Sequence, residues 1–127
     1  MSRFLPADHS KGDERTIGGY AAVHARPAAF EGRDGYSYSV EILADRTDDA
    51  ERPFGAFFLF VKWKRFGEQA VEGHLESAFL AHGGDADAAS AALGAMMIED
   101  VQRHLDALIA EREQVEHAAS SDDMDSA

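Results

Sequence analysis

The chain has 127 residues, and 24 acidic against 12 basic side chains give it a formal net charge of −12. This length suits one domain around one core, and the acidic excess disfavours binding to nucleic acid or to an anionic membrane surface. Cysteine is absent, which excludes disulfides, thiolate nucleophiles and cysteine-ligated metal sites.

The two ends of the chain differ in composition from its middle. Residues 1–16 are polar and show no hydrophobic period, which is typical of a flexible arm. The serine-rich acidic stretch 117–127 is typical of a disordered tail, so we expect one domain over 17–116. Neither a signal-peptide core nor an apolar run of ~20 residues is present, so we expect a cytoplasmic protein without a membrane span. The preference for Ala, Arg and Asp is typical of a GC-rich bacterial genome.

Two strands are predicted in the first third of this domain. Alternation over 19–26 predicts a first strand, which Pro27 confines to an edge or to its end. The glycines of 31–35 favour a hairpin loop. The second strand, 36–44, has the cleanest alternation, with one face formed by Tyr36, Tyr38, Val40 and Ile42.

The aromatic stretch 54–66 predicts a third, central strand. One of its faces carries Phe57, Leu59, Val61 and Trp63, and the other carries Phe58, Phe60, Lys62 and Lys64. A strand that is apolar on one face throughout and on the other over half its length is typical of the middle of a sheet.

A fourth strand is predicted over 70–80, and two registers with the third strand are open. A three-residue turn pairs Lys64 with Glu72 and Lys62 with His74, so that opposite charges meet on one face and apolar groups on the other. A two-residue turn instead sets Trp63 against Glu72. The first register is favoured by its charge pairing.

The stretch from residue 86 to 113 predicts one long helix, capped by Asp85 or Asp87. At ~1.5 Å per residue it spans roughly 40 Å, enough to cross the sheet. The sequence therefore predicts an α+β fold of two layers, a four-stranded antiparallel meander followed by one C-terminal helix. The face expected under the helix consists of Tyr38, Val40, Ile42, Phe57, Leu59, Val61, Trp63, Leu75 and Phe79.

One helix about 10 Å wide cannot cover a sheet nearly 20 Å across. Phe58 and Phe60 are left on the opposite face in this arrangement. We therefore expect them to form either the seam of a homodimer or a surface for another protein. Sequence does not separate these two interpretations, and a homodimer is the favoured one.

His74, with Glu72 and Glu76 two residues away on either side, is the candidate ligand or metal site. Two carboxylates and an imidazole alternating on one strand suit a divalent metal or acid–base chemistry. An exposed polar ladder that balances Lys62 and Lys64 is the commoner reason for such a pattern. No motif of a zinc hydrolase or a serine hydrolase is present, so the sequence assigns no enzyme activity and no cofactor.

Lys62, Lys64 and Arg65 surround Trp63 in the only cluster that combines basic and aromatic residues. Sheets that bind single strands of nucleic acid stack bases on aromatic rings and follow the backbone with Lys and Arg. The order of four strands and a helix resembles the architecture of the Whirly and related single-stranded-DNA-binding proteins, which implies such a function as an alternative. Net charge, Glu72 and Glu76 oppose it. A small, non-catalytic, homodimeric interaction protein is the favoured hypothesis.

Overall fold

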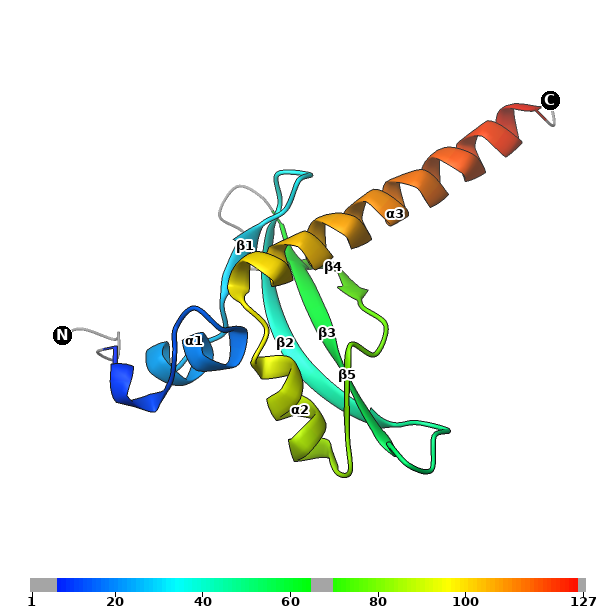
Figure 1. The fold of residues 1–127 in the computed structure, drawn as a ribbon. Coiled ribbons are helices and arrows are strands. Elements are labelled where there is room, and N and C mark those ends of the chain that lie inside the picture. The colour runs from blue at the N-terminus through cyan, green and yellow to red at the C-terminus, as the bar shows by residue number, and fades with distance from the viewer. Residues whose placement is uncertain (1–6, 65–69, 126–127) are drawn as a thin grey trace.

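A computed structural model describes residues 7–64 and 70–125 of the chain (Figure 1). Its strands form one antiparallel sheet in the order β1-β2-β3-β4, with β5 also paired to β3. Because β2 pairs along the whole of one edge of β3, β4 and β5 share the other edge. In chain order the elements are η1 (His9–Lys11), α1 (Ile17–His24), β1 (Ala29–Glu31), β2 (Ser37–Arg46), β3 (Phe54–Trp63), β4 (Val71–Glu76), β5 (Ala81–Gly83), α2 (Ala86–Gly94) and α3 (Ile98–Asp125).

The predicted α+β class is confirmed, with a four-stranded antiparallel meander and a long C-terminal helix. The fifth strand, β5, was not predicted. The second and third strands lie where the sequence places them, within two or three residues at their ends. No helix in the described part of the chain combines the length and the apolar character needed to cross a membrane.

The strand predicted over 19–26 is wrong, because this stretch forms α1. Thr16 caps the helix by accepting a hydrogen bond from the Gly19 N–H at 3.0 Å, and Ala25 ends it with φ of 54°. Small residues on nearly every side hide the helical period here. They also permit close packing, because a Cβ added at Gly18 would lie only 3.0 Å from the Gly94 Cα of α2. The first strand of the sheet is β1, past Pro27.

The long helix predicted over 86–113 is divided into α2 and α3 by a corner at 95–97. In a continuous helix the Ile98 N–H would donate to the carbonyl of Gly94. It donates instead to the Arg15 carbonyl at 2.8 Å, and the Met96 carbonyl accepts from the Ile17 N–H at 2.9 Å. The segment before α1 thus supplies the hydrogen-bond partners for the backbone groups at this corner, where the helix is interrupted. The predicted Asp85 cap is confirmed, since its carboxylate accepts from the Ala88 N–H at 2.7 Å.

Both predicted chain ends carry regular structure in their described parts. Residues 7–16, expected within a flexible arm, include η1 and a hydrogen bond from the Asp8 N–H to the Val23 carbonyl. The stretch 117–125, expected within a disordered tail, continues α3. Residues 1–6 and 126–127 lie outside the described residues.

The core lies between one face of the sheet and the helices α2 and α3 (Figure 1). Val40 pairs with Phe60 and Ile42 with Phe58, so these four side chains share the covered face. Phe58 and Phe60 have 0% exposure. The expectation that they lie on an uncovered face is therefore wrong. Their partners from the helices are Ala89, Leu93, Val101, Leu105 and Ile109.

The favoured register between the third and fourth strands is also wrong, by one residue. Val61 pairs with His74 and Lys62 with Gly73, and the register shifts again between Lys62 and Trp63. This irregularity adds a residue to one strand, so the charge pairing of the favoured register does not form. His74 consequently shares the uncovered face with Val61.

Candidate functional site

The side of the sheet away from the helices carries a row of large apolar side chains, here called the open sheet face. Along β3 it includes Phe57, Leu59, Val61 and Trp63, each half-buried. Leu43 of β2 and Phe79, between β4 and β5, are 38% and 40% exposed. The described helices pack on the other side, so in the described part of the chain this face has no second layer.

Two contacts hold the ends of the open sheet face in place. Trp63 donates a hydrogen bond from Nε1 to the Ser39 Oγ at 3.0 Å, which lays the indole across β2. At the other end, the rings of Phe57 and Phe79 meet edge to face with their centroids 5.9 Å apart. Gly55 makes room for Phe79, because a Cβ there would lie 2.5 Å from its ring. The face is therefore an ordered surface of aromatic and aliphatic groups.

Polar side chains border this apolar row on both neighbouring strands. On β2, Glu41 lies beside Leu59 and Ser39 beside Val61. On β4, Glu76 lies on the other side of Leu59, and His74 on the other side of Val61. His74 and Glu76 are 62% and 57% exposed at their side chains, with 4.0 Å between His74 Nε2 and Glu76 Oε1.

The three members of the predicted metal or acid–base site do not converge. Glu72 lies at the irregular end of β4 and, like His74, lines a cavity beneath α3, whereas Glu76 does not line it and lies on the open sheet face. Within residues 7–64 and 70–125, no three His, Asp or Glu side chains are arranged to hold a metal ion. His74 and Glu76 instead form part of a polar border.

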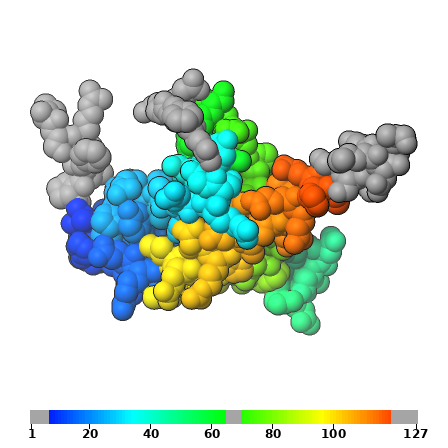
Figure 2. Space-filling view, turned by 90° about the horizontal axis from the view of Figure 1, so that it is seen from above, coloured from blue at the N-terminus to red at the C-terminus, as the bar shows by residue number. Residues whose placement is uncertain are grey.

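The cavity beneath α3 has a volume of about 590 Å³ and lies between β4, α3 and the β1–β2 hairpin. Figure 2 shows this hairpin, in cyan, against α3, in orange. The Arg33 N–H donates to Asp106 Oδ1 at 3.0 Å, and Gln102 Nε2 donates to the Glu31 carbonyl at 3.1 Å. These bonds fix the hairpin that forms one wall of the cavity.

A polar cluster within this wall joins the hairpin to β3. The Tyr38 hydroxyl donates to Asp34 Oδ2 at 2.7 Å, and Lys62 Nζ lies 3.5 Å from the same oxygen. Burial alone would raise the pKa of Asp34, but the hydrogen bonds from Tyr38 and from the Tyr36 N–H, with the Lys62 charge, lower it. Burial and the Asp34 carboxylate raise the pKa of Tyr38. The cluster's charges are thus matched within the fold.

The side chains of the predicted basic cluster do not share one face, because residues of β3 point alternately to the two sides of the sheet. Lys62 lies on the covered side, where its Nζ is 4.0 Å from the centre of the Tyr36 ring as well as near Asp34. Trp63 lies on the open sheet face, and Lys64 is exposed just beyond β3. Arg65 lies outside the described residues. The ammonium group of Lys62 therefore does not accompany Trp63 on one surface.

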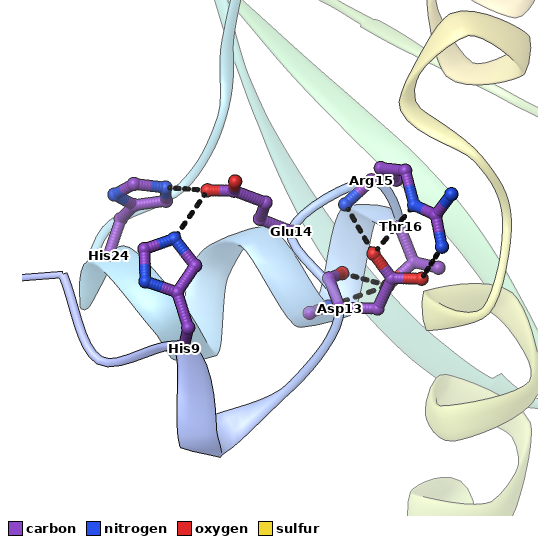
Figure 3. A network of polar contacts seen from close by, with 7 residues as sticks. His9, Asp13, Glu14, Arg15, Thr16 and His24 are labelled. Carbon is purple, nitrogen blue, oxygen red and sulfur yellow. Dashed lines mark hydrogen bonds and ion pairs between the residues drawn. The ribbon is translucent and has the colours of Figure 1, made fainter.

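A second group of titratable side chains lies beside α1 (Figure 3). The Nε2 atoms of His9 and His24 lie 3.2 Å and 2.9 Å from the same oxygen of Glu14, Oε2. The hydrogen bond with His24, opposed by partial desolvation and aided by His9, lowers the pKa of Glu14. This group joins η1 to the C-terminal end of α1. Sequence reasoning missed it because His9 falls in the predicted arm and His24 in the wrongly predicted strand.

Comparison with protein-family models, with curated proteins and with solved structures found no match. Function is therefore inferred from the chain's own surfaces. Among the described surfaces, the open sheet face is an ordered apolar feature that the fold leaves uncovered. Its apolar centre and polar border suit contact with another protein surface.

Proposed function

We propose that this protein is a non-catalytic interaction module that forms a homodimer through the open sheet face. The observation that carries the proposal is the row formed by Phe57, Leu59, Val61 and Trp63, which the fold orders but does not cover. Exposed apolar rows of this size on a soluble domain mark sites of contact with other proteins.

The composition of the face supports a protein partner over nucleic acid. Its centre is aromatic and aliphatic, and its border carries Glu41 and Glu76, which repel phosphate. Lys62, the best-placed cation on β3, is paired with Asp34 on the covered side. Within β3 as described, no lysine or arginine therefore lies beside Trp63 on the open sheet face, where a nucleic-acid backbone would require basic groups.

The dimensions of the face support a second copy as the partner. The β2–β3 ladder contains ten residue pairs. At about 3.3 Å per residue and 4.8 Å per strand, β2, β3 and β4 make a face of roughly 30 Å by 15 Å, or about 450 Å². Side-chain relief enlarges this value toward the lower limit of specific interfaces, which bury about 600–1,000 Å² on each partner. We therefore expect a reversible dimer.

The test is the solution mass, measured by light scattering behind a sizing column over a range of protein concentrations. We expect the mass to rise toward twice 13.8 kDa as concentration increases. Leu59→Asp, which puts a charge at the centre of the face, should hold the protein at the monomer mass because burial of an unpaired carboxylate is costly.

The matched control is Val115→Asp, which makes the same kind of change at an exposed apolar residue of α3, far along the chain from the sheet. This variant should dimerise like the unmodified chain. A monomer mass at every concentration, or a Leu59→Asp variant that still dimerises, would overturn the proposal.

A further inference from the structure

The open sheet face consists of rows of residues that run across the strands, and neighbouring rows differ in charge. One row is Glu41, Leu59 and Glu76, with an acidic residue at each end. The next row is Ser39, Val61 and His74, with no acidic residue. The packing of a second copy on this face therefore depends on which of its rows lies opposite each row of the first copy.

Four arrangements with two-fold symmetry are compared by the contacts of Glu76. An axis that crosses the strands at Val61 sets Glu76 against Val71 and His74 against His74, which leaves the carboxylate without a hydrogen-bond donor. We call this the Val61 arrangement, and the other three follow.

An axis parallel to β3 places β2 over β4 of the second copy, so Glu76 meets Glu41. An axis that crosses the strands at Leu59 makes Glu76 meet Glu76 of the other copy. Both arrangements bring carboxylates together in two places, which is unfavourable in a partly buried interface.

The third arrangement has an axis that crosses the strands midway between Leu59 and Val61. Each row then meets the other kind of row. Glu76 meets His74 of the second copy, and Glu41 meets Ser39. Along β3, Leu59 meets Val61, and Phe57 meets Trp63. Charged groups thus face partners that can donate hydrogen bonds, and the large apolar groups face one another.

We propose that the second copy packs in this third arrangement, with the two sheets face to face, their β3 strands antiparallel, and two Glu76–His74 contacts in each dimer. The inference rests on the proposed function and adds the register of the interface. Aligned sheets pack about 10 Å apart and rotate by about 30°. The contacts of β4 tolerate this rotation because β4 lies only one strand, about 4.8 Å, from β3.

The test is a charge exchange at residues 74 and 76, both exposed on an edge strand. The dissociation constant of the dimer is measured by sedimentation at pH 7.5, where Lys and Glu are charged. His74→Glu places like charges at both contacts and should raise the dissociation constant about tenfold. The double variant His74→Glu/Glu76→Lys restores opposite charges and should return it to within about threefold of the original.

Two single variants serve as controls. Gln114→Glu changes the net charge by the same amount as His74→Glu but lies on the exposed part of α3, and it should leave the dissociation constant within about twofold. Glu76→Lys should weaken the dimer modestly, because a lysine then faces His74. Circular dichroism verifies that each variant is folded.

Failure of the register and failure of the dimer give different results. A dimer that Leu59→Asp abolishes, but that the double variant does not restore, would overturn the register and leave the proposed function standing. Tightening by Glu76→Lys alone would show that Glu76 meets an acidic residue, and would also overturn the register. A protein that has the monomer mass at every concentration would overturn both the proposed function and the register, and the mass measurement alone would show this.

Discussion

The two faces of β3 have similar compositions and different surroundings. Phe58 and Phe60 point toward the helices and have 0% exposure, whereas Phe57, Leu59 and Val61, their immediate neighbours in sequence, remain half-buried. Burial along this strand is decided by where α2 and α3 pack and not by the hydrophobicity of the strand. Replacing the same type of residue should therefore change the free energy of unfolding by different amounts on the two faces, and mutation can measure this difference.

The largest difference is expected between two adjacent phenylalanines. Phe58→Ala removes a fully buried ring that contacts Phe60 and His104, and should lower the free energy of unfolding by about 3–5 kcal/mol. Phe57→Ala, on the open sheet face, should cost about 1 kcal/mol or less in the monomer. Urea unfolding at low protein concentration measures both. Equal costs would show that the two faces are equally covered.

A pair of glycines gives a second comparison between the faces. A Cβ at Gly83, on the covered side, would lie 2.6 Å from the backbone nitrogen of Ala89 in α2. Gly83→Ala should thus cost about 1–3 kcal/mol, because the helix must shift. The three atoms nearest a Cβ at Gly55 all belong to the Phe79 ring, and Phe79 is 40% exposed, so this ring can rotate away. Gly55→Ala should therefore lower the free energy of unfolding by less than Gly83→Ala, which thermal unfolding of both variants measures. A larger loss for Gly55→Ala would contradict this expectation.

The polar cluster of Asp34, Tyr38 and Lys62 lies at the edge of the covered face and gives a third comparison. Asp34→Asn replaces the carboxylate that accepts the Tyr38 hydroxyl and attracts Lys62, so it should cost about 1–3 kcal/mol at pH 7. The control Asp100→Asn removes an exposed partner of Arg103 and should cost under about 0.5 kcal/mol.

The sign of the pH dependence follows from the lowered pKa of Asp34. Folding stabilises the charged form, so this stability is present above the ordinary carboxyl pKa, near 4, and is lost as pH falls through the lower folded value. The difference between the unmodified chain and Asp34→Asn should therefore shrink below about pH 4. A difference that stays constant into acid would show that the Asp34 charge does not contribute.

Local patterns predicted much of the fold. The alternation of β2 reflects its one covered face, and the Asp85 cap follows from side-chain chemistry next to a helix. α1 could not be predicted this way. Its eight residues are rich in Gly and Ala, so they fit the two-residue period of a strand as well as the 3.6-residue period of a helix. The corner between α2 and α3 depends on hydrogen bonds to Arg15 and Ile17, about eighty positions earlier, which no local pattern contains.

The candidate site was only half predictable for a related reason. The sequence correctly groups Phe57, Leu59, Val61 and Trp63 on one face, because alternation fixes this. It does not show whether that face or its opposite aligns with Val40, since the loop between β2 and β3 sets the pairing. The irregularity at Lys62 then placed His74 beside Val61 on the open sheet face, which no local pattern predicts.

The corner at residues 95–97 makes the helical content of the C-terminal half depend on the N-terminal segment. The Ile17 N–H and the Arg15 carbonyl bond the Met96 carbonyl and the Ile98 N–H, two groups that would bond along the chain in a continuous helix. A chain that lacks its first 17 residues loses both bonds, and the stretch from Ala86 onward is then free to close into one uninterrupted rod. Such a rod could not follow the bend from α2 to α3 over the sheet. Shortening the chain at one end would thus lengthen a helix at the other and uncover part of the core.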